Sequence, residues 1–294
     1  MKLEIVRAVF DMWLTIWRKH LHASNNLVVM DLFAGRGTYI DNGEEVPGTP
    51  LIFMEVIKEH FIEKERKFKG ENSKIKIFFI EAKKKYFQNL ESTLKNFLKQ
   101  NPTLSNLVEL NLENDDCNGV IENLLQTYPS IHDPMFILID PWGLHIKYDT
   151  MEKIMSFPNR KDILFNFILE GVTRASGVAR KVARGEEVRK QEISTTKTLI
   201  EFLGPEVDIL KAKNKWEILE QYSKALFTRK EYKVVIYDMY YPNREDVIYY
   251  LIFACIKRTI TDIVKEIYKR FKEKEKPSLF GAEKRIKEYN NNNQ

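Results

Sequence analysis

A short apolar segment followed at once by a glycine-rich turn is the feature that most constrains the fold of this chain. The run Val28–Leu32 is typical of a buried strand, with Asp31 near its end, and Gly35 and Gly37 come directly after it. Glycine has no Cβ atom, so the backbone N–H groups of such a turn can approach a ligand closely. The pattern is compatible with a nucleotide-type cofactor loop and with an ordinary strand-to-loop turn.

The complete string around the turn narrows this choice. Residues Asp31–Gly37 read Asp-Leu-Phe-Ala-Gly-Arg-Gly, which resembles the first motif of S-adenosylmethionine (SAM)-dependent methyltransferases. A nicotinamide site is a poorer match, because Ile40 stands where its third glycine is expected. The resemblance implies that the following residues bind SAM: Asp31, Phe33, Ala34, Gly35 and Gly37. Asp31 would orient water or the ligand's ammonium group; alternatively, it only caps loop amides.

Apolar segments recur along the chain and alternate with helical stretches. The predicted strands are Leu27–Leu32, Ile75–Ile80, Leu107–Leu112, Met135–Ile139 and Ile163–Leu169. Their lack of polar alternation is expected for parallel strands covered by helices on both faces. Lys233–Met239 and Val247–Cys255 then predict a hairpin around the turn Tyr240–Arg244. We therefore expect an α/β fold: a Rossmann-like SAM-dependent methyltransferase sheet, mostly parallel, with a C-terminal antiparallel hairpin and helices on both faces.

The 294 residues suffice for one large domain with an appendage. An amphipathic helix is predicted over residues 1–22, before the first strand. We expect residues 1–256 to form a Rossmann-like methyltransferase domain with a basic helical insertion at about 170–232. Residues 257–294 would add a basic helix at about 260–274 and a polar tail. The tail, ending in Asn291–Gln294, has no apolar side chains to bury and is expected to be frayed or disordered.

Composition excludes several classes of protein. The two cysteines, Cys117 and Cys255, form no metal-ligand spacing and no disulfide framework, and the five histidines show no metal-ligand spacing. No apolar run approaches the ~20 residues that span a bilayer, and Asp11 and Arg18 interrupt any signal-peptide pattern. We expect a cytoplasmic protein with no metal site and no membrane segment. The net charge of +5 permits a nucleic-acid partner without identifying one.

Glu81 ends the second predicted strand, where a carboxylate can accept hydrogen bonds from both ribose hydroxyls of a nucleoside. It lies farther from Gly37 than the usual interval of about 20 residues. The additional residues between Gly37 and Glu81 require an insertion at Asp41–Pro50 and a long helix through Glu65. The alternative is a solvated charge at the end of a strand.

Two further acids, Asp115 and Asp116, follow the third predicted strand. A carboxylate there can accept a hydrogen bond from the exocyclic amine of adenine, or cap a helix beginning near Gly119. Asp115 is slightly favoured as the cofactor ligand, but the sequence does not decide between the two.

The fourth predicted strand ends in Asp140-Pro141-Trp142-Gly143. This resembles the Asp/Asn-Pro-Pro-aromatic motif of methyltransferases that act on nucleobase amino groups, but Trp142 replaces the second proline. Asp-Pro-aromatic-Gly is more similar to tRNA guanine-N2 methyltransferases. The resemblance implies that Asp140 and the Pro141 carbonyl accept the target amine while Trp142 stacks on the base. The alternative is a proline turn with a buried tryptophan. Because the chain has no Pro-Cys dipeptide, a cysteine-dependent cytosine-C5 mechanism is disfavoured.

Basic residues follow the fifth predicted strand, on the side of the sheet where substrate would bind. They form either a mobile clamp on a phosphate backbone or a solvated helical surface. The candidates for nucleic-acid contacts are Arg174, Arg180, Lys181 and Arg184.

Several separate segments together resemble the three-Cys-motif partner protein (TcmP) family. They are Trp13–Trp17, Asp31–Tyr39, Gly48–Leu51 (where the family often has Gly-Ser-Pro), Phe79–Glu81, Asp140–Gly143 and Tyr249–Ala254. The resemblance implies a methyltransferase-like Rossmann fold and a protein partner with a cysteine motif. Gly48-Thr49-Pro50 could form a lip of the cofactor pocket or start a helix.

We thus expect a SAM-dependent methyltransferase acting on an exocyclic amino group of a nucleobase in nucleic acid, with RNA slightly favoured. The alternative is a catalytically degenerate methyltransferase-like partner subunit that binds nucleic acid or protein. A small-molecule methyltransferase is a third option, which would require a closed apolar pocket.

Overall fold

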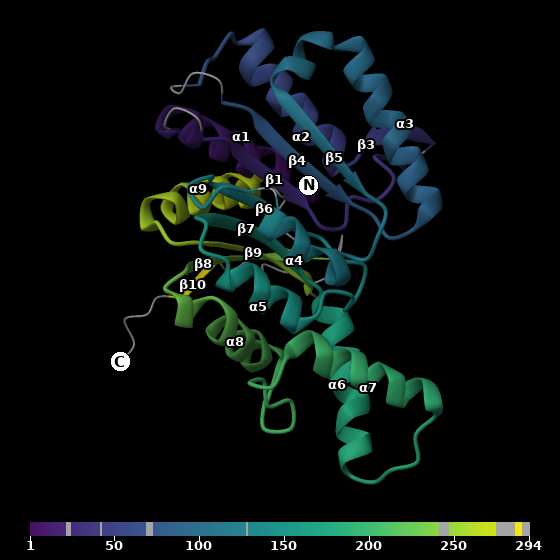
Figure 1. Cartoon of the computed structure of the whole chain (residues 1–294). Helices are drawn as coiled ribbons and strands as arrows, with labels where there is room; N and C mark the ends of the chain where they lie inside the picture. Colours follow the sequence, from purple (N-terminus) through teal and green to yellow (C-terminus); the bar gives the residue numbers. More distant parts are fainter. Residues whose placement is uncertain are drawn as a thin grey trace. The chain divides into compact units, whose positions relative to one another are not determined.

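The computed structural model of this chain describes residues 1–21, 25–41, 43–68, 73–127, 129–240, 247–274 and 286–289. The chain forms two compact units. Unit 1 comprises Met1–Asp140 and Pro158–Leu164, and unit 2 comprises Pro141–Phe157 and Phe165–Gln294. In the described residues the main sheet has the strand order β10-β8-β9-β7-β6-β1-β4-β5, and Figure 1 labels its strands and helices.

Unit 1 contains four parallel strands in the order β6-β1-β4-β5. Their bounds are β1 Leu27–Asp31, β4 Ile75–Ile80, β5 Val108–Glu113 and β6 Met135–Ile139. Asp31, the last residue of β1, is in register with Phe79 of β4 and Leu138 of β6. Because parallel strands end at the same edge of a sheet, the residues that follow these strands lie on one side of unit 1.

The helices of unit 1 pack apolar faces against this sheet. They are α1 Lys2–His20, α2 Thr49–Lys58, the π-helical turn η1 Glu59–Glu63, α3 Lys84–Gln100, the 3₁₀ turn η2 Pro102–Asn106 and α4 Cys117–Thr127. Phe10 of α1 lies 4.4 Å from Phe53 of α2 and 5.3 Å from Phe136 of β6, measured between ring centroids. The indole N–H groups of Trp13 and Trp17 both donate to the buried Asp162 carboxylate. These contacts fix α1 against the sheet.

A separate two-stranded antiparallel sheet overlaps the insertion predicted at Asp41–Pro50, which contains β3 and the last residue of β2. Its strands are β2 Thr38–Asp41 and β3 Glu44–Pro47, with Tyr39 opposite Val46. Where β3 ends, the N–H of Gly48 donates to the carbonyl of Gly37 at 2.8 Å. The hairpin therefore leads the chain back to the glycine loop.

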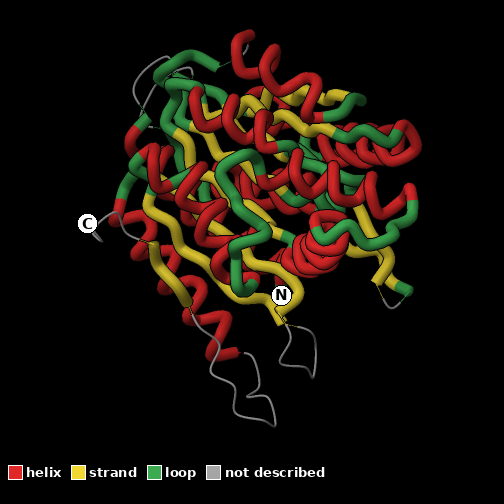
Figure 2. The backbone as a smooth tube through the Cα atoms, turned by 90° about the horizontal axis from the view of Figure 1, so that it is seen from below, coloured by secondary structure: helices red, strands yellow, loops and turns green. Residues whose placement is uncertain are grey.

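Unit 2 is built on an antiparallel arrangement. β8 Lys233–Tyr240 pairs with β9 Val247–Cys255 and, on its other side, with β10 Ile286–Tyr289. Its helices are α5 Tyr148–Ser156, α6 Leu169–Ala183, α7 Lys190–Leu203, α8 Lys215–Leu226, the 3₁₀ turn η3 Thr228–Lys230 and α9 Arg258–Lys274. α9 packs against β8 and β9, and the backbone of these elements can be followed in Figure 2. The ring centroids of Tyr268 in α9 and Tyr237 in β8 are 5.0 Å apart. β7, Lys161–Phe167, has residues in both units.

The predicted fold class is confirmed. In the order of the sequence predictions the sheet runs third, second, first, fourth and fifth strand, then seventh and sixth, which is a Rossmann-like methyltransferase sheet ending in an antiparallel hairpin. Four predicted strands have other boundaries in the structure. The first ends at Asp31 and the sixth at Tyr240, while the third is Val108–Glu113 and the fifth is Lys161–Phe167. Neither the β2–β3 hairpin nor β10 was predicted.

Some of the sequence predictions concern residues outside the described ranges or are not tested by the structure. Most of the predicted hairpin turn, 241–244, and the polar tail, 291–294, lie outside the described residues. The division at residue 256 stays a prediction. Across the described ranges, none of the helices combines the length and apolarity needed to cross a bilayer.

Candidate functional site

Asp31, at the end of β1, has no exposed surface. Its Oδ1 accepts a hydrogen bond from the N–H of Phe33 at 3.1 Å, and its Oδ2 accepts one from the Thr49 hydroxyl at 2.5 Å. Burial raises the pKa of Asp31 to about 7, and the nearby Asp140 adds to the increase. The two hydrogen bonds and Lys2 oppose it. Asp31 therefore caps the loop, as the alternative reading expected, and also changes charge near neutral pH.

The glycine loop adopts a backbone conformation that favours glycine. Gly35 has a φ of +67° and Gly37 a φ of +84°. A Cβ atom at Gly35 would collide with the hydroxyl of Tyr39, whereas at Gly37 it would meet Thr93 and Leu90 at ordinary contact distances. The space above Gly35 is thus filled by a tyrosine of the protein, a reason for glycine that the sequence argument did not include.

Glu81 ties this loop to the end of β4. Its Oε2 accepts the N–H of Gly35 at 3.0 Å and its Oε1 accepts the N–H of Lys83 at 2.7 Å. One residue earlier in the loop, the N–H of the buried Ala34 donates to the Ile80 carbonyl. Each carboxylate oxygen can accept more than one hydrogen bond, so the half-buried Glu81 retains the capacity to accept hydroxyls.

The phenol of Tyr39, in β2, lies within electrostatic reach of three predicted acids. Burial and, to a lesser extent, the charges of Asp31, Asp140 and Glu81 together raise the pKa of its phenol to about 12, while Arg36 opposes them. The structure therefore brings Asp31, Glu81 and Asp140 together, as their positions at strand ends predict. Tyr39 itself was not predicted, and its place directly after the glycine loop was its one signal in the sequence.

Asp140, which follows β6, forms an ion pair with Lys2, which is far from it in the sequence. Its Oδ2 accepts a hydrogen bond from Lys2 Nζ at 2.7 Å, and the side chains are 20% and 30% exposed. Lys2 lies in the first turn of α1 and carries no sequence motif. Sequence reasoning missed it for that reason.

The residues after Asp140 differ in exposure. Pro141 is buried, whereas the Trp142 side chain is 77% exposed. The alternative of a buried tryptophan in a structural turn is therefore wrong. A large exposed ring at this point in the chain is available for stacking.

The two acids in the loop after β5, Asp115 and Asp116, make different hydrogen bonds. Asp116 Oδ1 accepts the N–H of Asn118 at 3.0 Å at the start of α4, which begins at Cys117 rather than near Gly119. Asp115 Oδ1 accepts the N–H of Asp116. The neighbouring Asn114 donates to the Glu81 carbonyl at 2.8 Å, which connects this loop to Glu81. Asp116 thus serves as a helix cap, and Asp115 is the better candidate for a ligand contact.

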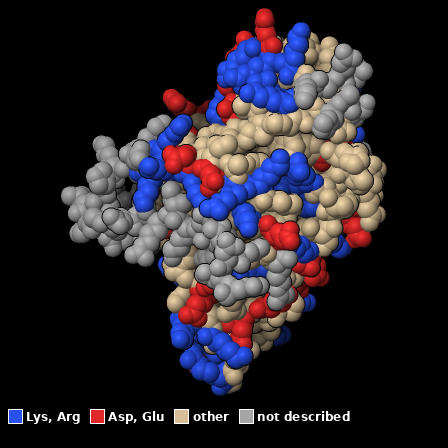
Figure 3. Space-filling view, turned by 90° about the vertical axis from the view of Figure 1, so that its left-hand side faces the viewer, with Lys and Arg blue, Asp and Glu red and all other residues tan. Residues whose placement is uncertain are grey.

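The four predicted nucleic-acid residues lie on and just after α6, and they are not equivalent. Arg174 and Lys181 are exposed. Arg180 donates to the carbonyls of Ile209 and Ala212, at 3.2 and 2.7 Å, and Arg184 pairs with Glu186 at 2.8 Å. On the face drawn in Figure 3, Lys and Arg side chains gather in patches interrupted by acids. Because Arg180 donates to these two backbone carbonyls of unit 2, it supports the fold of that unit.

Cys117 and Cys255 are both buried and free, and burial raises the pKa of the Cys117 thiol. Within the part of the chain that the structure describes, no group of three or more His, Cys, Asp and Glu side chains is placed to hold a metal ion.

No protein-family model and no curated protein matches this sequence. Among solved structures, protein LPL1258 from Legionella pneumophila is similar over 98% of this chain and 96% of that chain, with a TM-score of 0.53 and 9% identity. A human methyltransferase 10 domain containing protein matches over 85% and 82%, with a TM-score of 0.35 and 9% identity. Geranyl diphosphate C-methyltransferase from Streptomyces coelicolor, in complex with S-adenosyl-L-homocysteine, matches over 83% and 78%, with a TM-score of 0.30 and 9% identity. The likeness to the Legionella protein extends over nearly the whole fold, and the strand order makes that fold methyltransferase-like.

Proposed function

We propose that this chain is a SAM-dependent methyltransferase that acts on an exocyclic amino group of a nucleobase in nucleic acid, with RNA favoured over DNA. The observation that carries the proposal is the meeting of three carboxylates beside the glycine loop. Asp31 ends β1, and Glu81 and Asp140 follow the adjacent parallel strands β4 and β6; the charges of all three raise the pKa of the Tyr39 phenol. Ligands of open α/β sheets bind outside this edge.

The residues present fit the chemistry of SAM. Bound SAM supplies a methyl group on a positively charged sulfonium, together with an ammonium group and a ribose diol. Asp31 in its ionised form would bind the ammonium, and Glu81, held by the Gly35 amide, would accept the ribose hydroxyls. Asp115 would accept the adenine amine. A cluster of acids also complements the positive charge of the cofactor.

The residues after β6 support an amine as the acceptor. Asp140 and the Pro141 carbonyl would accept its N–H groups and so direct its lone pair towards the methyl group. The exposed Trp142 would stack on a base that is unpaired or taken out of its helix. Arg174 and Lys181 would contact phosphates.

A second candidate function is a methyltransferase-like subunit without catalysis that binds nucleic acid or a protein partner, such as a three-Cys-motif protein. One observation favours it: the carboxylate of Asp140 is paired with Lys2. In that case Asp140 would be a structural residue.

Calorimetry with SAM tests the cofactor site. We expect Glu81→Gln to weaken SAM binding by roughly 10- to 100-fold, the effect of weakening hydrogen bonds to a charged acceptor. Glu109→Gln makes the same change on an exposed residue of β5 and should leave the affinity unchanged. Absence of SAM binding to a folded wild-type protein would eliminate the proposal.

Transfer of labelled methyl groups to total RNA, DNA or protein then identifies the substrate class. We expect Asp140→Ala to abolish transfer and to keep SAM binding, with Asp149→Ala, an exposed acid in α5, as the control. Undiminished transfer by Asp140→Ala would refute the amine-acceptor role.

A further inference from the structure

The acceptor carboxylate of the proposed site already holds an amine that belongs to the protein. Lys2 Nζ lies 2.7 Å from Asp140 Oδ2, a distance typical of a charge-assisted hydrogen bond. This is the contact that the proposed function assigns to the amino group of the substrate. Lys2 therefore stands where an amine is expected to receive a methyl group.

Lys2 is positioned by a regular element rather than by a loose terminus. α1 begins at Lys2, and the N–H of Ile5 donates to the Met1 carbonyl at 3.0 Å. α1 is held farther along by Trp13 and Trp17, which donate to Asp162. The side chain of Lys2 is 30% exposed and that of Asp140 20%, so the pair is partly shielded from water.

Lys2 also lies close to the acid that we assign to the cofactor. Its charge lowers the pKa of the buried Asp31, whereas Asp140 raises it. The ammonium of Lys2 is thus near both the cofactor-side and the substrate-side carboxylates. These are the two ends between which a methyl group would be transferred.

We propose that Lys2 is a self-methylation site, whose ε-amine receives a methyl group from SAM while it is hydrogen-bonded to Asp140. The inference rests on the proposed function. In the reaction the Lys2 ammonium first releases one proton to solvent, and its lone pair then attacks the methyl carbon. The C–S bond breaks, its electron pair stays on sulfur, and the products are a methylammonium and a neutral thioether. A nucleic-acid substrate would compete with Lys2 for Asp140.

The test uses the full chain, incubated with methyl-labelled SAM and read by mass spectrometry of the peptide that contains Lys2. We expect a label on Lys2 whose rate does not depend on protein concentration and falls when a methylatable nucleic acid is added. Asp140→Asn should slow labelling at least tenfold. Lys2→Arg should remove the labelled peptide, while Lys197→Arg, a change at a 78% exposed lysine of α7, should have no effect.

A second measurement needs no cofactor. Acetylation by a small reagent should modify Lys2 more slowly than the exposed Lys197, and Asp140→Asn should remove the difference. Thermal unfolding confirms that each variant is folded. Equal acetylation of Lys2 in wild type and Asp140→Asn would overturn the inference.

The two proposals fail separately. If calorimetry shows SAM binding and Lys2 stays unlabelled, self-methylation is refuted and the proposed function stands. If SAM does not bind, both are refuted.

Discussion

At the scale of single residues, the behaviour of the site depends on how far each polar group is removed from water. Asp31 has no exposed surface, and burial places its pKa at about 7 instead of near 3.8. The folded state therefore binds this proton more tightly than the unfolded state does. The contribution of Asp31 to stability is present below pH 4 and is lost as the pH rises towards 7.

The affinity for SAM should rise as the pH increases from about 6 to about 8, because Asp31 must be ionised to bind the ammonium group. Calorimetry in two buffers of different ionisation enthalpy should detect proton release on binding. Asp31→Asn should bind more weakly and show a flatter pH dependence. A wild-type affinity that does not change over this range would contradict the role of Asp31.

Gly35→Ala should destabilise the protein by about 1–2 kcal/mol, because alanine is strained at a φ of +67° and its Cβ would collide with Tyr39. Gly119→Ala is the control, since a Cβ there meets nothing within 4 Å in a helix. It should be neutral or stabilising by up to about 1 kcal/mol. Urea unfolding measures both, and equal effects would show that the loop conformation does not require glycine.

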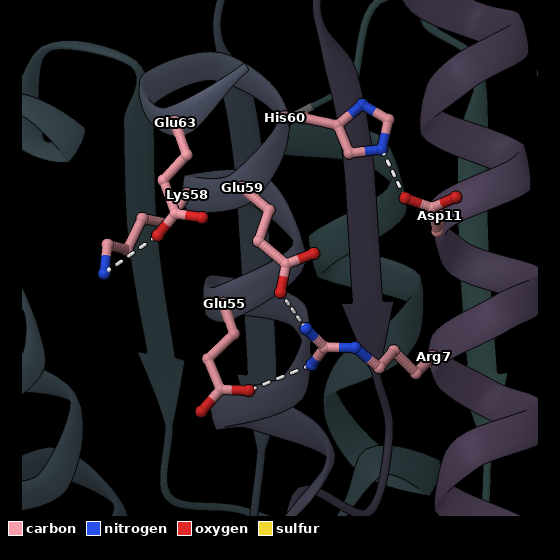
Figure 4. A network of polar contacts seen from close by, with 7 residues as sticks. All are labelled: Arg7, Asp11, Glu55, Lys58, Glu59, His60 and Glu63. Atoms are coloured by element: carbon pink, nitrogen blue, oxygen red, sulfur yellow. Dashed lines mark hydrogen bonds and ion pairs between the residues drawn. The ribbon is translucent and has the colours of Figure 1, made fainter.

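At the scale of elements, a polar network joins α1 to α2 and η1 (Figure 4). Arg7 of α1 pairs with Glu55 and Glu59, and His60 Nε2 lies 2.6 Å from Asp11 Oδ1. A neutral His60 that donates from Nε2 can also accept from Arg66 at Nδ1, 3.2 Å away. The network fixes the helix that carries Lys2.

Asp11→Asn should destabilise the protein by about 1 kcal/mol at pH 7, a discounted value because this side chain is 45% exposed. The hydrogen bond with His60 lowers the pKa of Asp11, so its contribution is present above about pH 4 and is lost as the pH falls below it. Urea unfolding at pH 7 and pH 3 should show the difference vanish. Glu63→Gln, which breaks the exposed pair with Lys58, is the control and should cost less than about 0.5 kcal/mol.

The sequence predicted the buried strands well because each is a continuous apolar run, as in β4 and β6. It missed β2, β3 and β10, which have four residues each and no extended apolar pattern. Asp31, Glu81 and Asp140 were predicted together because strand ends share an edge. Lys2 and Tyr39 were not, because their contacts arise when α1 and the hairpin pack beside that edge.

At the scale of the whole molecule, β5 and β10 are the outermost strands of the eight-stranded sheet that the described residues form. Edge strands expose N–H and C=O groups that can pair with another chain. β5 carries the charged Glu109 and Glu113, which disfavour such pairing. β10 pairs along β8 from Val234 to Tyr237.

Truncation after Lys274 should promote self-association, because it removes β10 and leaves that side of β8 without its partner strand. Light scattering over a range of concentrations would detect the larger species, with SAM affinity as a control for an intact unit 1. A truncated protein that stays monomeric at every concentration would show that β10 does not protect this edge.

Without β10, the exposed edge of β8 can pair with another β-strand. An antiparallel peptide with the sequence of β10 needs only main-chain hydrogen bonds and the existing register to complete the sheet. Added in excess to the truncated protein, it should reverse the association. In that case β10 is a replaceable edge strand, and a competing β-strand from another molecule would open or close this edge of unit 2 without changing the proposed cofactor site.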